Sequence, residues 1–143
     1  MPRHYNKLKS YEKIKRLGFN QQLKDRPKII FYSSLVLVGY VVSHLIDHGT
    51  TALIGCVAGI AGHWKATWIS KVEVSNANRR ETEEFLISNR YSFNKNKDYW
   101  EPDIHRLLRF DAQDIMIKKD DDLLLVIGPF YILKKMLSKP QFQ

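Results

Sequence analysis

Two apolar segments separated by a short polar turn constrain this chain more than any other feature. The first segment, residues 29–46, has no Asp, Glu, Lys or Arg, and the second, residues 51–68, has only Lys65. A helix over 29–46 would be about 27 Å long, and about 20 mostly apolar helical residues cross the hydrocarbon core of a bilayer. The sequence therefore predicts a membrane hairpin of two transmembrane helices.

The second predicted helix is the weaker of the two, because its uncharged part ends at residue 64. Lys65 would have to extend its side chain toward the lipid headgroups. Trp64 and Trp68 lie four positions apart, so they share a helix face, and tryptophan is enriched at the membrane interface. We therefore expect Trp64, Lys65 and Trp68 to lie at the membrane interface.

Small residues recur along this second helix at the spacing of one turn. Gly55 and Gly59 form a GxxxG motif, and Ala58 and Gly62 repeat its spacing. Small residues four apart let two helices approach closely in lipid. The pattern favours a helix-packing role for these four residues, with the first helix of the hairpin or a separate membrane helix as the partner.

The basic excess of the chain is concentrated before the hairpin. The net charge is +8, and residues 1–28 carry most of it. A short amphipathic helix capped by Ser10 and ended by Gly18 would present cations to anionic lipid headgroups. The alternative is a solvated leader that only sets topology. No nucleic-acid-binding motif is recognised, so nucleic acid is the less favoured partner. The predicted anionic-lipid residues are Lys7, Lys9, Lys13, Lys15 and Arg16.

The orientation of the hairpin follows from its flanks. Lys and Arg crowd both outer ends, whereas the connecting turn has neither. The positive-inside rule then places both termini on the cytoplasmic side of a bacterial inner membrane, or on the matrix side of a mitochondrial one. A competing interpretation makes the two apolar helices the buried core of a soluble helical protein. That interpretation explains the lengths but not the charge-free first segment or the Trp/Lys flank.

Residues 70–143 predict a small cytoplasmic α+β domain. We expect a helix within 70–90, a loop over 91–101 and a short helix opened by Pro102. Alternating and continuous apolar runs predict two strands, 114–118 and 123–127, around a polar turn. Gly128 and Pro129 would end the second strand and start a helix over 130–137. The domains expected are thus a basic arm over 1–28, the hairpin over 29–69 and the domain over 70–143.

Candidate chemistry is sparse. His44, Asp47 and His48 resemble part of an inverted zinc-protease motif, with Asp in place of Glu, but a third ligand is missing nearby. The simpler interpretation is an interfacial polar turn. The acidic residues 120–122 lack the spacing and central glycine of a calcium loop. We therefore assign no catalytic, cofactor-binding or metal-binding residue and no cofactor.

These features favour a non-catalytic, membrane-anchored accessory or assembly protein. It would hold a protein partner, a larger membrane complex or a second copy of itself, at the inner face of a membrane. One alternative is a membrane-bound immunity or exclusion factor that acts by direct contact. The other is a metal-dependent membrane enzyme that uses His44, Asp47 and His48.

Overall fold

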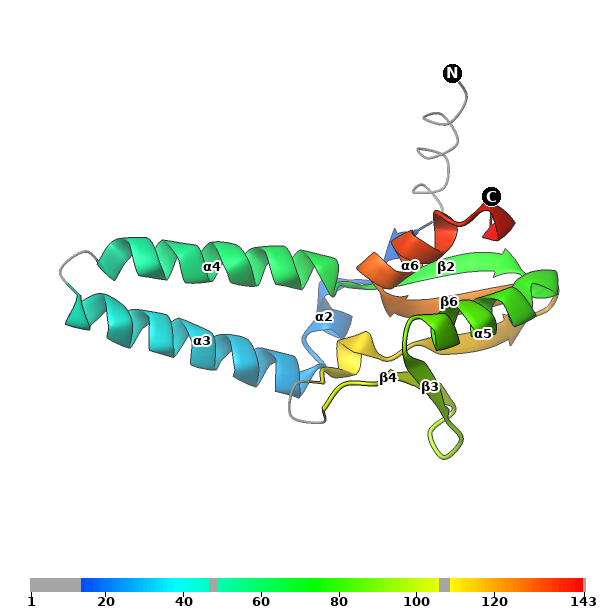
Figure 1. Cartoon of the computed structure of the whole chain (residues 1–143), viewed down its shortest axis with the longest axis horizontal. Coiled ribbons are helices and arrows are strands. Elements are labelled where there is room, and N and C mark those ends of the chain that lie inside the picture. The colour runs from blue at the N-terminus through cyan, green and yellow to red at the C-terminus, as the bar shows by residue number, and fades with distance from the viewer. Residues whose placement is uncertain (1–13, 47–48, 106–108, 143) are drawn as a thin grey trace, which may run out of the picture.

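In the computed structural model, a long helical hairpin projects from a small α+β domain (Figure 1). The structure describes residues 14–46, 49–105 and 109–142. The hairpin consists of α3 (Arg26–Leu45) and α4 (Gly49–Ala66). The other elements, in chain order, are β1 (Lys15–Arg16), α2 (Phe19–Gln22), β2 (Ile69–Ser75), η1 (Asn76–Asn78), α5 (Arg79–Ser88), β3 (Tyr91–Asn94), β4 (Tyr99–Pro102), η3 (Asp111–Gln113), β5 (Met116–Asp120), β6 (Leu123–Pro129), α6 (Phe130–Leu137) and η4 (Pro140–Phe142).

The start of α3 is specified by two neighbouring residues. The Asp25 carboxylate accepts a hydrogen bond from the Lys28 backbone N–H at 3.0 Å, which satisfies one of the free donors of the first turn. Pro27 follows in that turn, where its missing N–H costs nothing. At 1.5 Å per residue, α3 is about 30 Å long.

The main sheet is antiparallel, with the strand order β1-β2-β6-β5. β2 and β6 pair along their whole length, from Ile69 opposite Pro129 to Ser75 opposite Leu123. β5 and β6 form a tight hairpin, and Asp121 in its turn has a φ of 48°. Aspartate tolerates this left-handed conformation better than most residues because its short polar side chain bonds locally.

One face of the sheet carries the core of the domain. α5 and α6 lie on this face, and α6 contacts both central strands (Figure 1). Alternate residues of β2 and β6 point into the core, as the two-residue period of a strand requires. The buried members include Val72, Val74, Leu124, Val126, Phe85, Leu86, Leu133 and Met136.

A second, two-stranded ribbon joins the end of the sheet. β3 pairs with β4, and β4 is bound to the residue before β5. The Trp100 backbone N–H donates to the Ile115 carbonyl at 2.7 Å, and the Ile115 N–H returns a bond of 2.9 Å. This bridge holds the ribbon beside the start of α3, next to the base of the hairpin (Figure 1).

The C-terminal elements were predicted well, whereas the middle of the domain was not. The hairpin β5–β6 and helix α6 are confirmed, and Ile132, Leu133 and Met136 of α6 are buried as expected. The helix expected within 70–90 is present as α5, but it starts only at Arg79, because residues 69–75 form strand β2. The loop expected over 91–101 is the β3–β4 ribbon, and Pro102 ends β4 rather than opening a helix.

The expected amphipathic helix of the basic arm is wrong in its described part. Lys15 and Arg16 form the edge strand β1, which pairs with Lys71 and Ser70 of β2. Gly18 does not end a helix but precedes α2. The half-buried Ile14 packs against the core of the domain. Residues 1–13, with Lys7, Lys9 and Lys13, lie outside the described residues.

Candidate functional site

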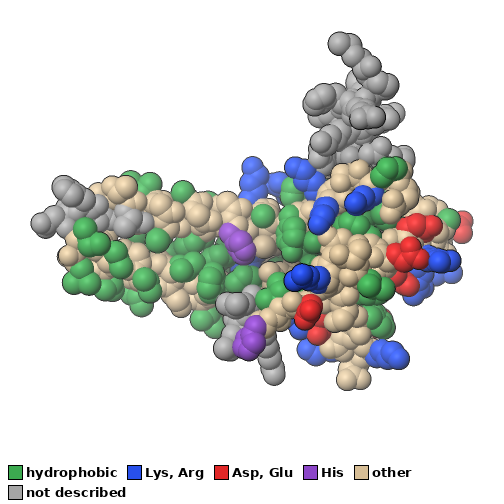
Figure 2. All heavy atoms as spheres, viewed as in Figure 1, with side chains coloured by type: hydrophobic (Ala, Val, Ile, Leu, Met, Phe, Trp, Pro, Cys, Tyr) green, Lys and Arg blue, Asp and Glu red, His purple; other side chains and the backbone are tan. Residues whose placement is uncertain are grey.

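The hairpin exposes apolar side chains along its length (Figure 2). α3 is long and apolar enough to cross a membrane, yet only 17% of its apolar window is buried. Among the described helices, α3 alone meets this test of length and composition. α4 does not meet it. The exposed large apolar residues of the two helices are Ile30, Phe31, Val36, Leu37, Val38, Tyr40, Val41, Leu45, Ile54 and Val57.

Gly39 of α3 packs against α4, whereas the predicted glycines of α4 do not pack against α3. A Cβ atom on Gly39 would lie 3.1 Å from Cys56 Sγ and 3.7 Å from Leu53 Cδ1. By contrast, a Cβ atom on Gly55, Gly59 or Gly62 would lie more than 4 Å from the surrounding heavy atoms of the described residues. The first helix of the hairpin therefore does not pack closely against these three glycines. The exposed Ala58 lies beside them.

A buried polar cluster lies at the base of the hairpin, where α3 starts and α4 ends. Lys28 is 0% exposed, and its Nζ donates to the Thr67 carbonyl at 3.3 Å. The same ammonium lies 4.8 Å from the centroid of the Trp64 ring, within the range of a cation–π interaction. Asp25 is also buried, and its second oxygen accepts from the Ala112 N–H at 2.7 Å. The cluster thus joins both helices to the domain.

Gln22 provides a second link between the base and the sheet. Its Nε2 donates to the Ile69 carbonyl at 3.0 Å, and its Oε1 accepts from the Ile69 N–H at 2.8 Å. Trp68 Nε1 donates to the Leu17 carbonyl at 2.9 Å, and its ring lies 6.3 Å from that of Phe19. Sequence reasoning missed this role of Gln22, because its partner lies 47 residues away.

The predicted interface residues gather at this base. Trp64 is half-buried, with its ring 5.3 Å from that of Tyr32, and Trp68 is half-buried against α2. Lys65 is exposed. Asp25, the acidic residue between β1 and the start of α3, is buried and hydrogen-bonded, whereas Asp111 of η3 beside it is exposed. The exposed cations around this end of the hairpin are Lys15, Arg16, Lys24, Arg26 and Lys65.

A cavity of about 460 Å³ opens between the two helices next to this base. Apolar side chains of α3 and α4 form its walls, and Phe110 and Gln113 close its domain end. The Tyr32 hydroxyl and His63 Nδ1 form a hydrogen bond at one side. Gln113 is 8% exposed, and its Oε1 accepts from the Phe110 N–H at 3.0 Å. We call this the hairpin cavity.

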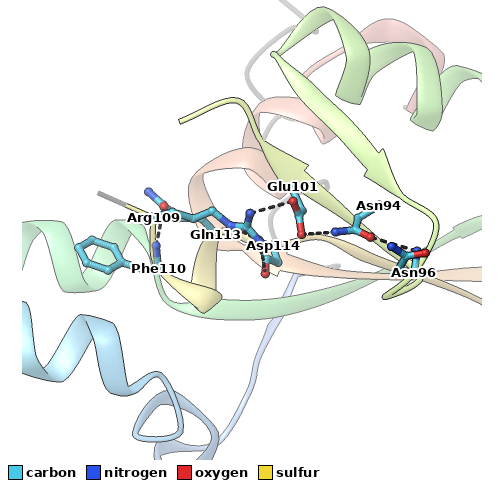
Figure 3. Close-up of polar contacts among 7 residues, drawn as sticks. All are labelled: Asn94, Asn96, Glu101, Arg109, Phe110, Gln113 and Asp114. Carbon is cyan, nitrogen blue, oxygen red and sulfur yellow. Dashed lines mark hydrogen bonds and ion pairs between the residues drawn. The ribbon is translucent and has the colours of Figure 1, made fainter. Parts of the chain in front are cut away.

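A separate ion-pair network lies beside the base, between the β3–β4 ribbon and β5 (Figure 3). Arg109 contacts Glu101 at 2.8 Å and Asp114 at 3.2 Å, and Asn94 donates to Glu101 at 2.7 Å. The hydrogen bond from Arg109 lowers the pKa of Glu101 to about 2. Burial raises the pKa of Asp114 to about 6, although Arg109 opposes this effect. Because both acids hold the guanidinium, Arg109 is not free to bind a further anion.

The residues proposed for a metal enzyme are not brought together in the described part. His44 packs edge-on against Tyr40, with the ring centroids 4.5 Å apart. Among the described residues, no group of three His, Cys, Asp or Glu side chains could hold a metal ion. Asp47 and His48 lie outside the described residues, so the structure does not test that alternative.

Comparison with known proteins identifies no relative. No protein-family model matches the chain, and no curated protein or solved structure matches it significantly. Function is therefore inferred from the residues and geometry of this chain alone.

Proposed function

We propose that this chain is a non-catalytic, membrane-anchored accessory protein that holds a protein partner at the inner face of a membrane. The observation that carries the proposal is the apolar surface of the hairpin, which the described part of the chain leaves uncovered. Burial of one large apolar side chain contributes about 1.5–3 kcal/mol. Soluble monomers rarely expose large contiguous apolar surfaces, and such surfaces mark contacts with a membrane or with another protein.

The packing of the hairpin supports placing α4 in the membrane together with α3. α4 is less apolar by the test of length and composition, and its last turn contains His63 and Lys65. The two helices pack along each other, and the domain holds the start of α3 and the end of α4 (Figure 1). If α3 enters the bilayer, α4 enters with it, and its polar last turn then lies at the headgroups.

The charge at the base supports the orientation. Exposed cations from β1, from α3 and α4 and from the segment before α3 surround the base. Each Lys or Arg near an anionic membrane surface contributes about 1 kcal/mol of attraction. The domain and both termini would therefore lie on the cytoplasmic or matrix side, with the base against the inner leaflet.

The uncovered small-residue face of α4 supports a protein partner. Gly55, Ala58 and Gly62 present no large side chain, and the three positions lie on adjoining turns. In lipid, helices associate through such faces because their backbones approach closely. The partner would be a helix of a larger membrane complex or of a second copy of this chain.

A matched pair of substitutions tests the membrane placement. Leu37 in α3 is 63% exposed and Ile87 in α5 is 62% exposed. In water, Lys at either position would change little. In a bilayer, Lys near the middle of a membrane helix costs about 2.5–3.5 kcal/mol. We expect Leu37→Lys to move most of the protein from the alkali-resistant membrane fraction to the supernatant, and Ile87→Lys to leave it in the membrane.

Two results would count against the proposal, each against a different part of it. Wild-type protein that stays in solution without detergent, folded and free of lipid, would refute the membrane anchor. Protein that leaves the membrane in mild detergent as a monodisperse monomer, at every detergent concentration tried, would refute the accessory role while leaving the anchor intact.

A further inference from the structure

The hairpin cavity has the form of a binding site for an amphiphile. Phe31 and Leu35 of α3 line it on one side, and Gly59 and Ile60 of α4 on the other. Its volume of about 460 Å³ lies within the usual range for small-molecule sites, which are mostly apolar with a few placed polar groups. Phe110 from the domain closes one end, so the cavity lies where the hairpin meets the domain.

Two hydrogen-bond donors at the polar side of the cavity have no partner among the described residues. Gln113 uses its Oε1 to accept from the Phe110 N–H, and its Nε2 makes no hydrogen bond in the part of the chain that the structure describes. In the tautomer in which the Tyr32 hydroxyl donates to Nδ1 of His63, the neutral imidazole carries its proton on Nε2. Gln113 is more than nine-tenths buried as a residue and lines the cavity, but its Nε2 is not among the buried atoms of the described residues that lack a partner, so a ligand in the cavity can reach this donor.

The chemistry of the cavity selects one occupant. Water is a poor one, because a buried water needs two to four polar partners and most of these walls are apolar. A chain of methylene groups fits the walls, and oxygen acceptors fit the two donors. Cations at the same end of the hairpin, Arg26 and Lys65, favour a negatively charged group just outside.

We propose that the hairpin cavity binds one acyl chain of a glycerophospholipid from the surrounding bilayer. The ester oxygens accept hydrogen bonds from Gln113 Nε2 and His63 Nε2, and the phosphate lies toward Arg26 and Lys65. The lipid site rests on the proposed membrane placement of the hairpin. A lipid held in this way fills the gap between α3 and α4 near the domain, where their own side chains leave a cavity.

A photoreactive lipid tests the site directly. The full chain is reconstituted into lipid nanodiscs that contain a phosphatidylglycerol with a diazirine in one acyl chain. After illumination, tandem mass spectrometry of the digested protein assigns the adducts to single residues, because residues 29–64 contain no Lys or Arg for trypsin to cut. We expect labelling concentrated on Phe31, Leu35 and Ile60, above the labelling of the outward-facing residues Leu37 and Ile54.

Two glycine substitutions form a matched pair. A Cβ added at Gly59 or Gly55 would have no neighbour within 4 Å, but only Gly59 lines the cavity. We expect Gly59→Leu to lower the labelling of the cavity residues about tenfold, the change that ~1.4 kcal/mol of lost affinity produces. Gly55→Leu should label like the wild type.

A third substitution tests the polar side and does not depend on filling the cavity. Gln113→Glu keeps the oxygen that accepts from the Phe110 N–H but removes both Nε2 protons. We expect it to lower the labelling several-fold while the circular dichroism spectrum stays unchanged.

Failure of the lipid site and failure of the membrane anchor are distinguishable. If the wild type stays in the membrane after alkaline extraction but its cavity residues label no more than the outward-facing ones, the lipid site is refuted and the anchor stands. Equal labelling of Gly59→Leu and Gly55→Leu also refutes the site. If the wild type leaves the membrane on alkaline extraction, the anchor fails and the bilayer lipid proposed here fails with it.

Discussion

Arg109 shows at the scale of single residues how one cation affects two acids differently. Glu101 and Asp114 both contact its guanidinium, yet their pKa values move in opposite directions. The hydrogen bond from Arg109 dominates at Glu101, whereas burial dominates at Asp114. A buried carboxyl is favoured in its neutral form, because a low-dielectric environment disfavours the charge.

These opposite shifts predict a stability profile with a maximum in the acid range. The pKa of Asp114 is raised from 3.8 to about 6, so between these values the folded state binds more protons than the unfolded state. The contribution of Asp114 to the free energy of unfolding therefore falls as the pH rises from about 4 to 6. At about 1.36 kcal/mol per pKa unit, the fall is about 3 kcal/mol. The urea midpoint measured in detergent at several pH values checks this.

Glu101 acts in the other direction and at lower pH. Its pKa is lowered from 4.5 to about 2, so its contribution is present above pH 4.5 and is lost as the pH falls toward 2. Asp114→Asn should abolish the fall between pH 4 and 6, and Glu101→Gln should reduce the loss at low pH. A midpoint that still decreases from pH 4 to 6 in Asp114→Asn would assign the effect to another group.

At the scale of elements, α3 and α4 pack closely at one glycine of the first helix. The sequence draws attention to the three glycines of α4, yet Gly39 is the one that meets the partner helix. A stripe of small residues shows where close approach is allowed. It does not show which face another helix occupies, since that depends on the rotation of each helix about its axis.

A second glycine pair tests this packing. Gly39→Leu must push Cys56 away, whereas Gly62→Leu enters open space. We expect Gly39→Leu to destabilise the hairpin by about 1–3 kcal/mol, the usual cost of overpacking a close contact. Gly62→Leu should leave stability equal or higher, because glycine is a poor helix former. Thermal unfolding followed by the helical circular dichroism signal measures both, and an equal effect of the two would refute the assigned contact.

The differences between the predicted and observed elements have local causes. Residues 72–74 read Val-Glu-Val, an alternation with period two that suits a strand, but the absence of proline and glycine up to residue 90 favoured a helix. The β3–β4 ribbon was missed because its residues are polar and Asn-rich. Its strands form through long-range packing, notably the bridge from Trp100 to Ile115.

At the scale of the whole molecule, buried polar residues fasten the hairpin to the domain. Asp25 accepts from Lys28 in its own helix turn and from Ala112, which is 87 residues further along the chain. Gln22 donates to Ile69 at the start of β2, and Lys28 donates to Thr67 just after α4. Because these bonds are buried, the hairpin and the domain should move as one unit.

The Asp25 link predicts a large effect from a small change. Asp25→Ala removes the α3 cap and leaves the buried Ala112 N–H without an acceptor, so we expect a loss of about 2–4 kcal/mol of stability. Distances between spin labels on Val41 of α3 and Glu83 of α5 should also broaden, as the hairpin loses its fixed direction.

Ser75→Ala is the matched control, because Ser75 caps η1 through a local bond of 3.3 Å to the Ala77 N–H. It should cost less than about 1 kcal/mol and leave the distance distribution narrow. Broadening in both variants, or in neither, would contradict a tertiary role for Asp25.

Elements whose cause is local could be deduced from the sequence by itself. The tight turn of β5–β6 needs a residue that tolerates a positive φ, α6 follows a Gly-Pro pair, and the long α3 depends on an uninterrupted apolar run after Asp25 and Pro27. The base cluster, the hairpin cavity and the Arg109 network could not be deduced in this way, because their members lie far apart along the chain. Their geometry depends on how helices rotate and strands pair, which side-chain packing decides only once the whole chain has folded.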